Sequence, residues 1–187
     1  MAQLFSNTLL LTLLIVSPTI AQIRYFPPNF PANWYESDLK AMKEPSLWES
    51  SKKQKTESYR FVWLRSFHNP VSIRIDLHSD GTSLLIRKMT TGVTGRAGRL
   101  IQNETFTLDH SQTSRFLERI EQYRFWKLPP VLEDRGDDGA QWIIEGVRDG
   151  NYHIADRWSP KAGEIRVLGL YMVRDLAKLR LTEGEIY

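Results

Sequence analysis

The chain has 187 residues, a formal net charge of +3 and no cysteine. Without cysteine it can form neither a disulfide nor a thiolate metal site. A net charge this small for the length gives no reason to expect steering toward nucleic acid, so we expect no nucleic-acid partner.

The first 21 residues carry no charged side chain, and their apolar stretch at residues 9–16 is shorter than the roughly 20 apolar residues that span a bilayer. Thr19 and Ala21 place small side chains where a signal peptidase needs them for a cut before Gln22. We therefore predict a signal peptide at residues 1–21 and an exported protein, located in the periplasm or secreted. The alternative is an uncleaved segment that anchors the chain to the membrane.

Cleavage would leave about 166 residues, the size of one domain with its own core. Three prolines and five aromatic residues at residues 22–36 predict an extended arm that lies against the domain. A loose arm that binds a partner is the alternative. A short helix is expected at residues 37–44, capped by Ser37 and ended by Pro45. A solvated polar connector then completes the segment 22–58.

Residues 59–187 are predicted to form a single domain that begins with four strands. Apolar and polar side chains alternate strictly at residues 71–78, which is typical of a half-buried antiparallel strand. Asp80-Gly81 is a strong hairpin signal after this strand. The other three strands are expected at residues 59–67, 83–89 and 100–108.

Two helices are predicted in the second half of the chain. The first carries Phe116 and Ile120 at helical spacing, begins at Asp109 or Ser111, and cannot continue through Pro129-Pro130. Trp126 is expected to fill the core just beyond its end.

The last helix is expected to begin with Ser159 as its cap and Pro160 in its first turn. Its buried stripe would comprise Ile165, Leu168, Met172, Leu176 and Leu179. Strands paired in hairpins and followed by helices predict an α+β fold, in which an antiparallel β-sheet built of hairpins carries two main helices on one face.

The stretch DDGAQWIIEGVRDGNYHIADRWSP, residues 137–160, reads as a further hairpin that holds many charged side chains. A three-residue loop would place Glu145 directly opposite His153. A two-residue Asp149-Gly150 turn would shift the pairing by one residue and place Glu145 on the face of Ile154. The first register sorts apolar from polar side chains better and is therefore favoured.

In the favoured register Glu145 and His153 could act as a proton-transfer pair, because a carboxylate orients an imidazole and raises its pKa. An exposed ion pair worth less than about 1 kcal/mol is the simpler interpretation, since no Ser or Cys nucleophile is near. We therefore assign no catalytic residue and keep these two as minority candidates. Asp156 would face the core and need a partner such as Arg. Arg157 has no structural task and is a candidate binding residue.

Neither a metal nor a cofactor is expected. The four histidines lack metal-ligand spacing, and EDRGDDG at residues 133–139 lacks the Asp-x-Asp-x-Asp-Gly pattern of a calcium loop. Asp138 in this acidic loop is instead a candidate for contact with a partner.

The loop TGVTGRAGR, residues 91–99, contains three glycines together with Arg96 and Arg99. Backbone amides and guanidinium groups of this kind can hold an anionic group, so both arginines are candidate binding residues. A flexible hairpin loop is the alternative, because the Gly-Lys-Ser/Thr of a phosphate-binding loop is missing and no helix follows.

Four segments together resemble a family of uncharacterised bacterial exported proteins: YRFVWLRSFHNPVSIRI, FWKLP, DGAQWIIEG, and YHIADRWSP with its following Gly-Glu-Ile-Arg helix. The resemblance covers most of residues 45–180. It implies the cell envelope or periplasm as the location and supports the fold, and it adds no catalytic residue because the family has no assigned activity.

These observations lead us to expect a non-enzymatic exported protein that binds an envelope partner or an anionic ligand. Two alternatives remain. One is a periplasmic hydrolase that uses Glu145 and His153. The other is a periplasmic immunity or inhibitor protein that blocks an enzyme with the acidic loop at residues 133–138.

Overall fold

The computed structural model describes residues 23–187 except 29, 31–32, 54–56, 93 and 132–135. The predicted signal peptide therefore lies outside the described residues. In the part of the chain that is described, no helix is both long enough and apolar enough to cross a membrane.

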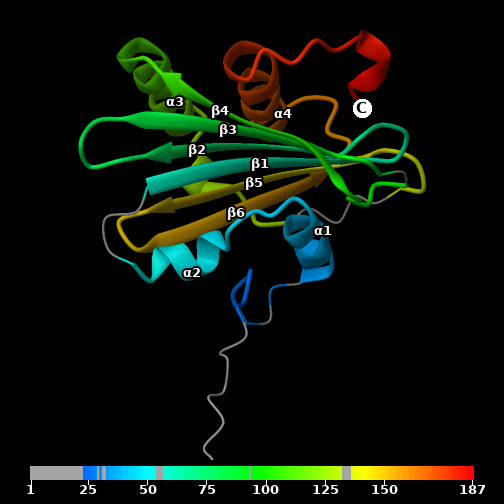
Figure 1. The fold of residues 1–187 in the computed structure, drawn as a ribbon, viewed down its shortest axis with the longest axis horizontal. Coiled ribbons are helices and arrows are strands. Elements are labelled where there is room, and N and C mark those ends of the chain that lie inside the picture. The colour runs from blue at the N-terminus through cyan, green and yellow to red at the C-terminus, as the bar shows by residue number, and fades with distance from the viewer. Residues whose placement is uncertain (1–22, 29, 31–32, 54–56, 93, 132–135) are drawn as a thin grey trace, which may run out of the picture.

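A single antiparallel sheet with the strand order β4-β3-β2-β1-β5-β6 forms the centre of the fold (Figure 1). The strands are β1 (Glu57–Arg65), β2 (Val71–Leu77), β3 (Ser83–Thr90), β4 (Leu100–Leu108), β5 (Ala140–Arg148) and β6 (Asn151–Trp158). The first four follow one another as hairpins, and the last hairpin then joins the free side of β1. The predicted α+β class and the hairpin-built sheet are confirmed, and β1 and β5 are interior strands.

Helices α3 (His110–Gln122) and α4 (Glu164–Leu170) pack on the same face of the sheet, as predicted (Figure 1). Asp109 caps α3, because its carboxylate accepts the backbone N–H of Gln112 at 2.8 Å. After α3, Phe125 is the fully buried side chain, and Trp126 packs partly buried beside it.

The last helix begins later than predicted, at Glu164 after Gly163. Ser159 cannot cap it, because the Ser159 hydroxyl accepts the N–H of Ala140 at 2.8 Å and ties the end of β6 to the start of β5. Beyond α4 the chain continues as a π-helical segment, Tyr171–Leu176. The predicted stripe does face the core: Ile165, Leu168, Met172 and Leu176 are buried, and Leu179 is partly buried.

The opposite face of the sheet is covered by the N-terminal segment and two short helices, α1 (Glu36–Ala41) and α2 (Leu47–Ser51) (Figure 1). Tyr25, Phe26 and Tyr35 are buried there, so the described part of the arm packs against the domain. Ser37 makes no capping hydrogen bond, contrary to prediction. The sequence reading missed α2, which Ser46 caps by accepting the N–H of Glu49 at 3.0 Å.

The favoured register of the last hairpin is wrong. The structure pairs Glu145 with Ile154 and Gly146 with His153, which is the register of the two-residue turn. Asp149 and Gly150 have φ values of 51° and 78°, as a type I′ turn requires. Sorting apolar from polar side chains failed as a guide because β5 is an interior strand whose residues 140–147 are buried on both faces.

Candidate functional site: a basic cleft above buried charges

Glu145 and His153 lie on opposite faces of the sheet and do not form the expected pair. Glu145 belongs to the face covered by the N-terminal segment, where Arg60 donates to it. His153 belongs to the face of α3, and its ring lies 5.0 Å from the Phe125 ring, centroid to centroid. Burial lowers the pKa of His153, so its surroundings favour the neutral imidazole. The pair on which the hydrolase hypothesis depends is therefore absent.

Arg157 and Asp156 hold the outer edge of β6. Arg157 donates to the carbonyl oxygens of Asp156 at 2.7 Å and Pro129 at 2.9 Å. Val131 forms an isolated parallel β-bridge with Asp156. Asp156 is buried opposite Ile143, as its predicted core position requires, although the core it faces lies on the side of the sheet away from α3 and α4. The side-chain amide of Gln141 donates to its carboxylate.

Arg96 fastens the loop at residues 91–99 to the start of α1. Its Nε lies 3.1 Å from the Asp38 carboxylate, its guanidinium donates to the Ser37 hydroxyl at 2.6 Å, and it lies over the Trp34 ring. Arg99 is exposed. The two candidate arginines therefore differ, since one is engaged in tertiary contacts and the other is open to solvent.

Asp138 is exposed at the rim of an aromatic cavity that is separate from these arginines. Within the described part of the chain, no group of three or more His, Asp or Glu side chains is placed to hold a metal ion. Residues 133–135 of the acidic loop lie outside that part.

A charge network is buried under the N-terminal segment, with Arg60 of β1 at its centre. Arg60 is completely buried and donates through Nε to Glu145 at 2.8 Å and through a terminal nitrogen to the Pro45 carbonyl at 2.6 Å. The Tyr152 hydroxyl donates to the other Glu145 oxygen at 2.8 Å. Burial opposes the charge of Arg60, but Glu145 and Glu44 outweigh it and raise the pKa of the guanidinium. Arg60 is therefore charged, and all three nitrogens of its guanidinium group donate hydrogen bonds.

Glu44 is the second buried carboxylate, and three cations surround it. Its oxygens lie 3.5 Å from Arg60, 3.3 Å from Arg74 and 3.1 Å from Lys88. Burial acts to raise the pKa of Glu44, but the charges of these three cations overcome it and lower the pKa. Arg74 also pairs with Asp76 at 3.2 Å.

The position of Glu44 follows from how α1 ends. Lys43 takes a left-handed conformation (φ 53°), and the N–H of Glu44 then bonds back to the Leu39 carbonyl at 2.9 Å. This position usually holds glycine, and a side chain there costs roughly 1 kcal/mol. The turn aims Glu44 at the sheet and frees the Lys43 carbonyl, which accepts from Lys88 Nζ at 2.7 Å.

A cleft of about 990 Å³ opens above this network, between the N-terminal segment, α2, β2 and β3. Its floor includes Arg74 and Lys88. Four further cations line it, all exposed: Arg24, Lys43, Lys52 and Lys53. The carboxylates that line the cleft are the buried Glu44 and the half-buried Glu49.

The rim cations exceed the acidic groups available to neutralise them. Lys52 pairs with Glu49 at 2.7 Å. No described residue forms an ion pair with Arg24, Lys43 or Lys53. The network below is balanced, with three cations against Glu44, Glu145 and Asp76, so it does not cancel the charge of the rim.

Sequence reasoning placed the anion-binding candidates at residues 91–99 and missed this cleft. The cations that form the cleft were visible in the sequence. Some lie in SSKKQKTES, residues 50–58, which was interpreted as a solvated connector, and others lie on the polar faces of the second and third strands. Their convergence depends on the unpredicted helix α2 and on the turn at Lys43.

No family model and no curated protein matches the chain.

Proposed function

We propose that this chain is an exported, non-enzymatic binding protein that holds an anionic ligand in the basic cleft. The observation that carries the proposal is the charge of the cleft rim, where Arg24, Lys43 and Lys53 have no ion-pair partner among the described residues. Uncompensated cations around a concave surface raise the local concentration of anions and provide charge-assisted hydrogen bonds.

The buried network gives this cleft a rigid floor. Glu44 and Glu145 are each held by at least one buried cation, so the strands and the N-terminal segment cannot shift without separating buried charges. A ligand that meets preorganised donors loses less binding free energy to ordering them.

The chemistry of the rim favours a ligand with more than one negative group. Lys43 and Lys53 carry compact ammonium groups, which suit phosphoryl or carboxylate oxygens, and Arg24 adds a guanidinium that can bind either group in a bidentate manner. The exposed Ile23 and Pro45 also line the cleft and would accept an apolar portion of the ligand.

Retention on phosphocellulose measures this binding. The variant Lys43→Gln with Lys53→Gln should elute at clearly lower salt and should bind tripolyphosphate about tenfold more weakly, because each exposed charge pair contributes up to about 1 kcal/mol. The matched control is Lys127→Gln with Lys178→Gln. It removes the same charge from two exposed lysines, and Lys178 shares the left-handed conformation of Lys43 (φ 52° and 53°).

Equal weakening in both double variants would show that only net charge matters, and the proposal would fail. If Arg99→Gln alone reduced tripolyphosphate binding more than the cleft variant did, the loop at residues 91–99 would be the binding site instead. An inhibitor role for the acidic loop predicts a stable one-to-one protein complex and is a separate proposal.

A further inference from the structure

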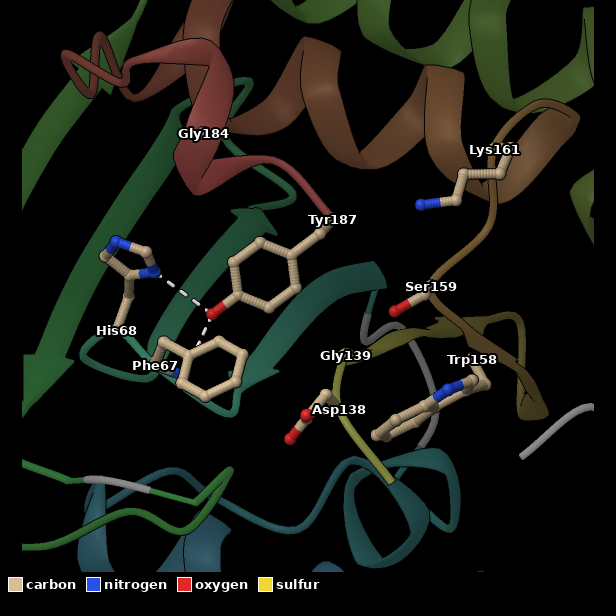
Figure 2. Close-up of a pocket in the computed structure, with 9 residues that line it drawn as sticks. All are labelled: Phe67, His68, Asp138, Gly139, Trp158, Ser159, Lys161, Gly184 and Tyr187. Atoms are coloured by element: carbon tan, nitrogen blue, oxygen red, sulfur yellow. Dashed lines mark hydrogen bonds between the residues drawn. The ribbon is translucent and has the colours of Figure 1, made fainter. Parts of the chain in front are cut away.

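A second cavity of about 600 Å³ lies at the end of the sheet where β6 leaves it, away from the basic cleft. Figure 2 shows Phe67 and Tyr187 on one side and Trp158 on the other. Asp138 and Lys161 lie on different sides of the space between the rings. Three aromatic rings and two opposite charges thus line one small volume.

The walls of this cavity are fixed in place by contacts of the chain itself. The Tyr187 hydroxyl accepts the backbone N–H of Phe67 at 2.9 Å and lies 3.0 Å from Nδ1 of His68 (Figure 2). A main-chain oxygen of Tyr187 accepts the indole N–H of Trp142 at 2.8 Å. The Phe67 and Tyr187 rings lie 5.9 Å apart, centroid to centroid.

The backbone at Gly136 and Gly139 packs closely against the third ring, that of Trp158. A Cβ at Gly139 would lie 2.7 Å from the Trp158 ring, and one at Gly136 would lie 2.8 Å from its indole nitrogen. Only glycine at both positions lets this loop pack directly against the indole. The ring is therefore set before any ligand arrives, and part of it remains accessible.

The two charged groups of the cavity are unused. Both Asp138 and Lys161 are exposed, and neither forms an ion pair with a described residue. The aromatic faces carry negative potential and attract ammonium groups, and a carboxylate beside them strengthens that attraction. Lys161 offers the complementary group for an anion.

We propose that this cavity binds a small zwitterion, whose alkylammonium group lies among the aromatic rings beside Asp138 and whose anionic group meets Lys161. The site shares no residue with the basic cleft and has a different preference, because a simple polyanion would be repelled by Asp138. A negative binding result at one site therefore does not affect the proposal for the other site.

Calorimetric titration of the whole chain with three probes tests the proposal. The probes are phosphocholine, choline and 3,3-dimethylbutan-1-ol, the uncharged isostere of choline. We expect phosphocholine to bind most tightly, choline about tenfold more weakly, and the isostere at least a further fivefold more weakly. Tryptophan fluorescence should change with the first two probes, because Trp158 lines the cavity.

Three variants assign the roles. Phe67→Ala should weaken choline at least fivefold, Asp138→Asn should reduce the difference between choline and its isostere, and Lys161→Gln should remove the advantage of phosphocholine over choline. Phe106→Ala is the control for an exposed ring on a distant strand, and it should change none of these affinities.

The proposal is overturned if phosphocholine fails to bind, if the isostere binds as well as choline, or if a neutral trisaccharide such as maltotriose binds more tightly than phosphocholine. Loss of tripolyphosphate binding to the basic cleft would leave the result at this cavity unchanged.

Discussion

Replacing Arg60 with methionine should reduce the free energy of unfolding by about 3–4 kcal/mol, because removing one partner of a buried ion pair leaves the other charge unpaired. Among the described residues, Arg60 is the one cation paired with Glu145. After the substitution Glu145 would keep only the Tyr152 hydroxyl as a side-chain donor. Glu44, by contrast, would retain Arg74 and Lys88.

The free-energy cost of leaving Glu145 unpaired has an upper limit. A glutamate that cannot stay charged takes up a proton, and at pH 7 this costs about 3.7 kcal/mol from an ordinary pKa near 4.3. Methionine fills much of the space of the arginine side chain, so cavity formation adds little. For a domain of this size the loss corresponds to a fall in melting temperature of roughly 10 °C.

Urea denaturation followed by tryptophan fluorescence and circular dichroism measures the effect, and a double-mutant cycle identifies its origin. Arg60→Met combined with Glu145→Gln should be more stable than the sum of the single losses predicts, by at least about 1.5 kcal/mol. A loss below about 1 kcal/mol for Arg60→Met, or strict additivity in the cycle, would refute the view that the two charges are coupled inside the sheet.

Three further predictions concern other parts of the molecule. The pKa of Glu44 lies below the ordinary value of a glutamate, so its contribution to stability is complete above about pH 4.3 and is lost as the pH falls. Glu44→Gln should therefore flatten the acid limb of a plot of unfolding free energy against pH. The pKa of His153 is lowered from 6.5 by burial, so stability falls as the pH drops below about 6.5, and an NMR titration that gives His153 a pKa above 6.5 would contradict this. Gly150→Ala should cost about 1–2 kcal/mol in urea denaturation, because φ is 78°, whereas Asp149→Asn should be neutral or slightly stabilising; equal effects would argue against the type I′ turn.

The sheet could be predicted from sequence because its signals are local. Strict alternation at residues 71–78 and the Asp80-Gly81 turn identify a hairpin without any knowledge of the rest of the chain. The apolar stripe of the last helix was also correct, since helical spacing fixes one face. Its start was not, because the Ser159 hydroxyl bonds to β5 across the sheet.

The register of the last hairpin and the basic cleft could not be predicted in the same way. Glu145 was placed on the solvent side because it is charged, but its partner Arg60 lies 85 residues away in the chain. An ion pair between strands so far apart in the chain leaves no local pattern in the sequence. Helix α2 has five residues, too few to show helical periodicity, and it brings Lys52 and Lys53 to the cleft.

The most direct test of the proposed function is an NMR titration of the isotope-labelled chain with tripolyphosphate. We predict saturable shifts of the backbone amides around Lys43, Lys53 and Lys88, with smaller shifts in the loop at residues 91–99. Shifts that centre on that loop, or weak shifts spread over all exposed lysines without saturation, would contradict the assignment of the basic cleft as the binding site.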